Sequence, residues 1–221
     1  MNVSHRLVII TAIFITCLIT ANVIAVKVIS LGPIILPAAI FIFPLSYIFG
    51  DVLTEVYGYR QARKVIWLGF ICNLIFVIFA WVGQVLPPAP FWGGQEAYES
   101  ILGYTPRLLA ASFCGYLAGE FTNSFVLAKM KILTRGRWLW SRTIGSTIVG
   151  QGLDTSIFIT LAFIGTPSFV PIMILYHWLA KTIIEAIATP LTYAIVNSVK
   201  KKEAIDTYDY ETNFNPFLVS D

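Results

Sequence analysis

Six long apolar stretches follow one another along the chain, with short polar segments between them. They lie near residues 7–28, 34–56, 64–86, 107–129, 143–165 and 171–197. Each is close to the length of about 20 residues that a helix needs to cross the hydrocarbon core of a bilayer. The runs are continuous, unlike the short alternating segments of a membrane β-barrel. The pattern therefore predicts an all-α integral membrane bundle of six transmembrane helices.

The composition indicates that lipid is the solvent for most of the chain. Hydrophobic residues make up 57% of the 221 residues. Charged residues make up only 12%, about half the share that is usual in soluble proteins. We expect a single membrane domain over residues 1–202. The polar residues 203–221 are expected to form a disordered tail.

Basic residues collect on one side of the expected bundle. Arg6 precedes the first stretch, and further basic groups lie at residues 60–64, 129–142 and 200–202. Because cytoplasmic segments are enriched in Lys and Arg, both termini are expected in the cytoplasm. The net charge of +3 follows from this asymmetry and gives no reason to expect a nucleic-acid partner.

Three carboxylates fall near the middles of expected helices, where charge is costly. Glu120, Asp154 and Glu185 stand in the fourth, fifth and sixth stretches, and Asn73 stands at a similar depth in the third. A charged residue at the bilayer centre costs about 2.5–3.5 kcal/mol on insertion scales. Three acids at one depth on successive helices predict a shared polar site for a substrate, an ion or a proton.

Polar neighbours three or four positions away share a helix face with these acids. The pairs are Asn123 with Glu120, Gln151 with Asp154, and Lys181 with Glu185. The competing interpretation is that the polar groups only pair with one another and hold the helices together. In that interpretation Lys181 neutralises Glu185 or Asp154 and has no further role.

A second acidic cluster lies at the cytoplasmic end of the second stretch. Asp51 and Glu55 are four residues apart and precede the basic residues 60–64. Either these acids form interfacial salt bridges, or they act as a cytoplasmic gate or carry a coupling proton.

Several motifs of enzymes and motors are absent from the sequence. It contains no Gly-x-x-x-x-Gly-Lys-Ser/Thr loop, no His-Glu-x-x-His and no Gly-x-Ser-x-Gly. We therefore expect no enzyme activity, no cofactor and no metal ion.

Several segments resemble the queuosine precursor transporter family, also described as a vitamin-uptake transporter family. They are residues 43–59 (FPLSYIFGDVLTEVYGY), 119–124 (GEFTNS), the basic loop ending at residue 142, 150–156 (GQGLDTS) and 181–185 (KTIIE). The resemblance implies a multi-pass importer of the bacterial inner membrane. Its small-molecule substrate would be 7-cyano-7-deazaguanine, 7-aminomethyl-7-deazaguanine or both, which are precursors of the tRNA nucleoside queuosine. It also implies likeness to the six-helix substrate-binding subunits of energy-coupling-factor vitamin transporters.

The chemistry of a deazaguanine agrees with these polar residues. The base presents two adjacent N–H donors beside a carbonyl acceptor. Asp154 or Glu120 would accept both donors, and Gln151 or Asn123 would donate to the carbonyl.

The remaining candidates have supporting roles in this hypothesis. Phe121 and Phe158 would stack on the ring. Asn73 and Glu185 would complete the site or carry a coupling proton.

Three functions are compatible with the sequence. The first is a stand-alone carrier that binds its substrate at the midplane. The second is a binding subunit that needs a separate ATPase partner, docked at the small-residue pattern formed by Ala21 and Ala25. The third is a membrane scaffold that transports nothing. The sequence also leaves open whether copies of the chain form a homo-oligomer.

Overall fold

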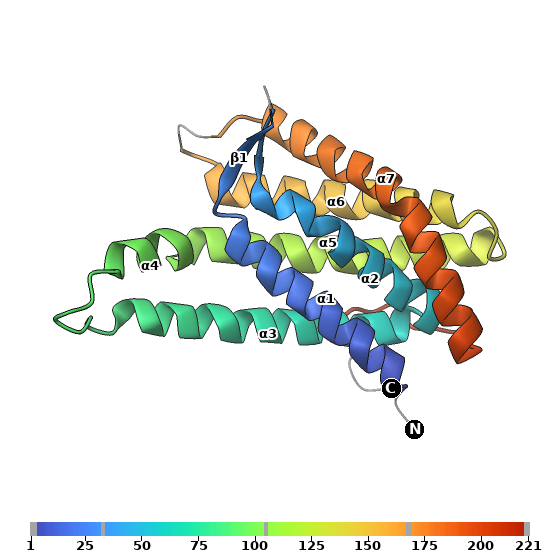
Figure 1. Ribbon diagram of the computed structural model, residues 1–221. Helices are drawn as coiled ribbons and strands as arrows, with labels where there is room; N and C mark the ends of the chain where they lie inside the picture. The colour runs from blue at the N-terminus through green and yellow to red at the C-terminus, as the bar shows by residue number, and fades with distance from the viewer. Residues whose placement is uncertain (1–3, 32–33, 104–105, 167–168, 219–221) are drawn as a thin grey trace.

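The computed structural model describes residues 4–31, 34–103, 106–166 and 169–218, and within these it consists of helices apart from one small β-hairpin (Figure 1). The elements are α1 (His5–Ile24), β1 (Val28–Leu31), β2 (Ile34–Pro37), the 3-10 helix η1 (Ala38–Phe41), α2 (Phe43–Tyr57), α3 (Tyr59–Val85), α4 (Gln95–Leu102), α5 (Pro106–Leu133), α6 (Leu139–Phe163) and α7 (Ile172–Glu203). Each of the six apolar stretches contains one long helix, and α4 is an additional short helix between α3 and α5. The β-hairpin and the two termini lie at opposite ends of the bundle, which we call the hairpin end and the terminal end (Figure 1).

Three helices have both the length and the composition of a membrane span. They are α1, α3 and α7, with mean hydropathies of 2.6, 2.5 and 1.4 in their most apolar windows. Helices α5 and α6 have 28 and 25 residues and so reach the required length, while α2 has only 15. The helix expected from residue 34 begins at Phe43, because residues 34–37 pair with β1 in an antiparallel hairpin. Pro44 then occupies the first turn of α2, where its missing N–H is not needed.

The outer faces of the helices are apolar. On α7, Ile183, Ile187 and Leu191 repeat every four residues and are 57%, 74% and 49% exposed. Helix α3 presents Ile75 and Phe79 in the same way. Several charged side chains, in contrast, are buried in the interior: Asp51, Glu55, Arg63, Lys131, Arg142, Glu185 and Asp209. This distribution is the reverse of a soluble protein and is typical of a protein whose surroundings are lipid.

Helix α2 lies at the centre of the bundle. Eleven of its 15 residues are buried, and Ile48, Val52 and Val56 are completely enclosed. These side chains pack against Phe14 of α1 and Val196 of α7 in the main hydrophobic core. The polar residues of α2 are buried with the rest of the helix, so they must find their partners inside the protein.

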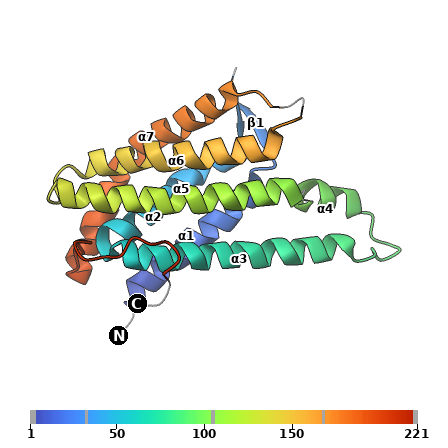
Figure 2. The same ribbon diagram turned by 180° about the vertical axis from the view of Figure 1, so that it is seen from behind.

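Helices α5 and α6 run side by side in opposite directions, with their backbones in close contact at glycine residues (Figures 1 and 2). A Cβ atom on Gly150 would lie 2.7 Å from the Cβ atom of Asn123 and 2.9 Å from the carbonyl oxygen of Gly119. A Cβ atom on Gly119 would lie 2.7 Å from the Cβ atom of Asp154. Small residues permit this backbone contact, which brings the polar residues of both helices together.

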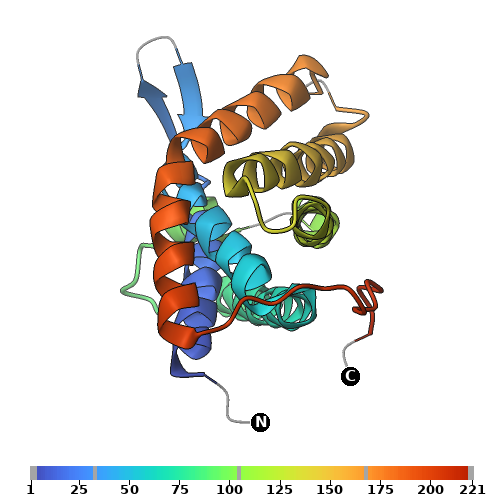
Figure 3. The same ribbon diagram turned by 90° about the vertical axis from the view of Figure 1, so that its right-hand side faces the viewer.

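The described part of the tail, residues 204–218, lies across the terminal end and contacts the bundle (Figure 3). Asp209 accepts hydrogen bonds from the backbone N–H of Tyr59 at 3.0 and 3.2 Å. Arg63 donates to the carbonyl oxygens of Asn213 and Asn215. The composition of the tail could not predict these contacts, because they depend on hydrogen-bond donors at the start of α3, which is far away in the sequence. Residues 219–221 lie outside the described residues.

The Asp209 carboxylate takes the place of a helix cap. The residue before α3 is Gly58, which has no side chain that accepts a hydrogen bond. Its φ of +82° suits glycine, and a Cβ atom there would lie 2.7 Å from Thr207. The first turn of α3 therefore depends on a side chain 150 residues away in the chain.

We predict that Gly150→Ala destabilises the protein by about 1–3 kcal/mol, because the new methyl group must push α5 and α6 apart. The matched control is Gly152→Ala on the same helix, where the nearest atom would lie at 3.4 Å, in Trp178. Thermal unfolding of both variants in detergent measures the difference. Equal melting temperatures would show that the glycine contact does not set the helix distance.

We predict that Asp209→Ala lowers the stability by about 0.5–2 kcal/mol, the usual cost of losing a helix cap. Amide hydrogen exchange should become faster at the start of α3. Glu211→Ala is the control, because Glu211 is exposed and nearby. Unchanged exchange in Asp209→Ala would mean that the tail does not cap α3.

Candidate functional site

A cavity of about 560 Å³ lies between α1, α2, α5, α6 and α7 in the half of the bundle near the hairpin end; we call it the central cavity. Its lining includes the polar residues Asn22, Ser46, Tyr47, Ser112, Tyr116, Glu120, Gln151, Asp154, Thr155, His177 and Lys181. Cavities of this size bind small organic molecules, and convergent polar groups fix the orientation of such a ligand.

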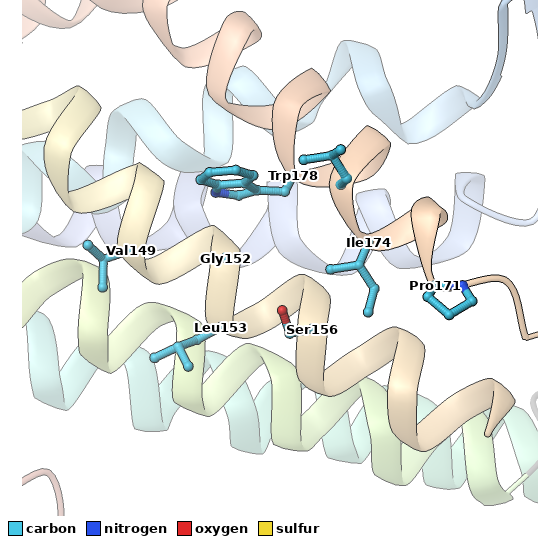
Figure 4. Close-up of a pocket in the computed structure, with 8 residues that line it drawn as sticks. Val149, Gly152, Leu153, Ser156, Pro171, Ile174 and Trp178 are labelled. Atoms are coloured by element: carbon cyan, nitrogen blue, oxygen red, sulfur yellow. The ribbon is translucent and has the colours of Figure 1, made fainter.

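A second hollow of about 550 Å³ is a groove between α6 and α7 (Figure 4). Its lining is apolar apart from Ser156 and the indole of Trp178. The indole N–H already donates to the carbonyl oxygen of Ile148 at 2.8 Å. Because exposed Leu153 and Leu175 border it, this groove matches the other lipid-facing surfaces. The central cavity is therefore the candidate site.

Asp154 and Lys181 form an ion pair in the wall of the central cavity. The Lys181 Nζ atom lies 2.5 Å from the Asp154 Oδ2 atom. Gly115 of α5 makes room for the pair, since a Cβ atom there would lie 2.8 Å from Asp154 Oδ1. The pairing of Lys181 with Asp154 is one of the two partnerships that the sequence left open.

Glu120 has a different environment from Asp154. It lines the central cavity and makes no hydrogen bond or salt bridge with any described residue. A Cβ atom on Gly50 of α2 would lie 3.6 Å from Glu120 Oε2, so the small residue leaves space beside the carboxylate. Both oxygens of Glu120 are available to a ligand.

Gln151 offers a donor to the same cavity. Its side-chain oxygen accepts a hydrogen bond from the Tyr47 hydroxyl at 3.3 Å. Its amide nitrogen donates to no described residue, and the side chain is only 4% exposed. A ligand carbonyl at this point would satisfy the amide.

Two of the expected site residues lie behind the cavity and not in its lining. Asn123 donates to Asp51 Oδ1 at 3.0 Å, and both residues are buried. Glu185 is fully buried. These residues occupy a level between the central cavity and the terminal end.

The other expected residues divide between the lining and the packing around it. Phe158 lines the cavity. Asn73 accepts a hydrogen bond at 3.0 Å from Asn22, which does line it. Phe121 packs on Trp67 with ring centroids 5.7 Å apart, and it is absent from the lining.

At the terminal end, five charged residues form what we call the terminal ion cluster: Glu55, Lys131, Arg142, Lys200 and Asp206. Arg142 and Lys200 contact Glu55 Oε1 at 2.8 and 2.7 Å. Lys131 and Lys200 contact Asp206 at 2.5 and 2.8 Å. Burial raises the pKa of Asp206, but the hydrogen bonds and charges of the two lysines lower it further, so the pKa lies below its ordinary value.

The sequence interpretation missed several of these residues. Lys131 and Arg142 were counted as loop bases, yet each side chain is only 1% exposed. Tyr47 was overlooked, although it stands four positions before Asp51 on the same face of α2. His177, which the sequence analysis did not single out, also lines the cavity. The spacing of four residues between Tyr47 and Asp51 was the signal that could have identified Tyr47.

Comparisons with known proteins agree on one family. The family model described as "Putative vitamin uptake transporter" matches residues 37–195. A "Probable queuosine precursor transporter" of Bacillus subtilis is 32% identical over 189 residues, which cover 84% of this chain and 82% of the relative. The "Queuosine precursor transporter" of Escherichia coli is 25% identical, covering 66% of this chain and 62% of the relative. No solved structure matches the chain significantly.

We predict that Asp154 and Lys181 are energetically coupled. Asp154→Asn and Lys181→Met should each lower the melting temperature, because each leaves an unpaired charge in the cavity wall. The double variant should lose less than the sum, with an interaction energy of about 0.5–3 kcal/mol. Additive losses would contradict the pairing.

The exposed pair formed by Arg6 and Glu203, at 3.2 Å, is the control for this cycle. Its coupling should be smaller, at about 0.2–1 kcal/mol, because the Arg6 side chain is 44% exposed and is screened by solvent.

Proposed function

Because the chain belongs to the vitamin uptake transporter family that includes the queuosine precursor transporters, we propose that it imports queuosine precursors across the bacterial inner membrane. The substrates are 7-cyano-7-deazaguanine, 7-aminomethyl-7-deazaguanine or both, and the base binds in the central cavity. This function explains why a lipid-embedded bundle keeps polar groups in its interior without an enzyme motif.

The observation that carries the proposal is that the Glu120 carboxylate and the Gln151 amide nitrogen, which bond to no described residue, line the same cavity. A 7-deazaguanine presents a ring N–H and an exocyclic amino group side by side, and a carboxylate accepts both. The ring carbonyl next to them accepts from the Gln151 amide. A base that lacks these groups would leave both residues unsatisfied, so the site would discriminate against it strongly.

The same geometry favours Glu120 over Asp154 as the bidentate acceptor. Asp154 is engaged by Lys181 at 2.5 Å. Its role in the proposal is to fix the ammonium group in the cavity wall. Glu120 has no such partner among the described residues.

Aromatic side chains of the lining provide a surface for the planar base. Phe158 lines the cavity on α6. Phe43 and Tyr47 of α2 are stacked on each other, with centroids 5.9 Å apart and planes inclined by 5°. A flat heterocycle that fits between these groups would be held by stacking as well as by hydrogen bonds.

The two ends of the bundle support an inward direction of transport. The central cavity lies in the half near the hairpin end. The terminal ion cluster and the tail fill the other end, where the basic residues suggest the cytoplasm. In our proposal the substrate enters from outside, and the terminal ion cluster must open to release it.

Ala21 and Ala25 do not offer the docking surface that an ATP-driven binding subunit was expected to use there. Ala21 is 3% exposed, and both Ala21 and Ala25 line the central cavity. A partner bound there would have to enter the substrate site. A scaffold without transport gives no reason for a carboxylate that pairs with nothing.

We predict that this gene restores queuosine in tRNA when it is expressed in a bacterium that neither makes nor imports the precursors. The cells receive 7-cyano-7-deazaguanine at low concentration. Glu120→Gln should reduce uptake about 10- to 150-fold, the equivalent of about 1.5–3 kcal/mol for a hydrogen-bonded charge.

The control for this experiment is Glu96→Gln, since Glu96 is an exposed residue of α4. It should import like the wild type. Wild-type protein that reaches the membrane and restores no queuosine, with or without an added ATPase partner, would refute the proposed substrate. Normal import by Glu120→Gln would refute the proposed acceptor.

A further inference from the structure

Two acids that the proposed function does not use lie between the central cavity and the terminal ion cluster. Asp51 of α2 is 1% exposed, and Glu185 of α7 is 0% exposed. The two carboxyl groups are close enough to interact electrostatically. Neither of them belongs to the lining of the central cavity, so a substrate in the cavity does not explain them.

Most oxygen atoms at this level have no partner among the described residues. Asp51 Oδ1 accepts from Asn123, but Asp51 Oδ2 and both oxygens of Glu185 accept nothing. The Asn123 side-chain oxygen is also buried without a partner among the described residues. An anionic carboxyl group cannot be buried in this way without a compensating cation or proton.

The described basic residues are engaged elsewhere. Lys181 pairs with Asp154, and Lys131, Arg142 and Lys200 belong to the terminal ion cluster. No salt bridge of the described chain reaches Asp51 or Glu185. No described residue therefore forms a salt bridge that neutralises the charge of this pair.

The titratable groups around the pair are themselves mostly acidic. Those that interact with it electrostatically are Tyr47 and Glu55 on α2 and Glu120 on α5. Asp154 on α6 and Lys181 on α7 are paired with each other. In the described parts of α1 and α3, no titratable group interacts with the pair. The described surroundings therefore leave the two carboxyl groups without a cation of their own.

Helix α2 connects this level to the two others. Tyr47, Asp51 and Glu55 follow at intervals of four residues and so lie along one face of the helix. Tyr47 lines the central cavity, and Glu55 is the centre of the terminal ion cluster. A change of charge at Asp51 is thus one helical turn from both the substrate site and the residues that close the terminal end.

We propose that Asp51 and Glu185 together bind one proton and release it once in each transport cycle, so that a proton gradient drives uptake. The proton forms an O–H bond with one carboxyl group of the pair, which reduces the negative charge of the two acids by one. It arrives from the outer solution while the terminal end is closed, and it leaves to the cytoplasm after the terminal ion cluster opens. No other reactant is consumed.

A proton fits this pair better than a metal ion does. The described residues contain no group of three His, Cys, Asp or Glu side chains placed to hold a metal. Two carboxyl groups share a proton without further ligands. The inference rests on the proposed import function, so its test needs one measurement that involves no substrate.

The first measurement is the infrared absorption of protonated carboxyl groups in the purified protein, reconstituted in liposomes and titrated with acid and base. The wild type should show a buried carboxyl band that is absent from the double variant Asp51→Asn, Glu185→Gln. Glu96→Gln should keep the band. Identical spectra for the wild type and the double variant would overturn the proposal, whatever the protein transports.

The second measurement is uptake of labelled 7-cyano-7-deazaguanine into the same liposomes. One proton enters with each molecule of the uncharged base, so the inside-to-outside concentration ratio of the base should reach the outside-to-inside ratio of protons. An inward gradient of one pH unit should therefore accumulate the base about tenfold. A sodium gradient should have no effect. Uptake that follows sodium, or that ignores the pH gradient, would overturn the proposal.

The variants separate binding from coupling. Asp51→Asn and Glu185→Gln should still exchange labelled for unlabelled base across the membrane, because neither residue lines the central cavity. Both should lose the accumulation that the pH gradient drives. Variants that accumulate the base like the wild type would overturn the role of the pair. Failure of the wild type to bind or exchange the base would refute the import function and leave the infrared result to decide the proton site.

Discussion

The interior of this bundle is governed by a shortage of positive charge. Inside a lipid environment every carboxylate needs a cation, a proton or a ligand, because water is not available to solvate it. Three bases converge on Glu55 and Asp206, and Lys181 is taken by Asp154. Asp51, Glu120 and Glu185 have no base left to them among the described residues. The places where protein partners are missing coincide with the places where the proposed functions need an acceptor.

Most of the long helices could be predicted from the sequence, because helices depend on local patterns. Apolar stretches of span length located α1, α3, α5, α6 and α7, and spacing of three residues placed Gln151 on the same face as Asp154, whereas the second stretch contains a β-hairpin and the 15-residue α2. Which acids pair with a basic residue and which remain without one could not be predicted in this way. It depends on which helix faces which, and therefore on glycine contacts such as the one between Gly119 and Gly150.

Two further features depended on long-range contacts that no local pattern encodes. The tail has the composition of a disordered segment, yet Asp209 finds the start of α3 and Asp206 finds two lysines. From the sequence alone, Arg142 is interpreted as a basic residue of a cytoplasmic loop. Its guanidinium group instead enters the bundle and meets Glu55.

The position of the tail has a consequence for the biosynthesis of the protein. Membrane helices enter the bilayer in the order in which they are made, and Lys200, Asp206 and Asp209 are made after the residues that they contact. Until then Glu55 has only Arg142 and Lys131 beside it, and the first turn of α3 lacks its cap. The terminal end of the bundle thus closes only after residue 209 has been made, so a chain that is interrupted before this point would remain in the membrane with that end open.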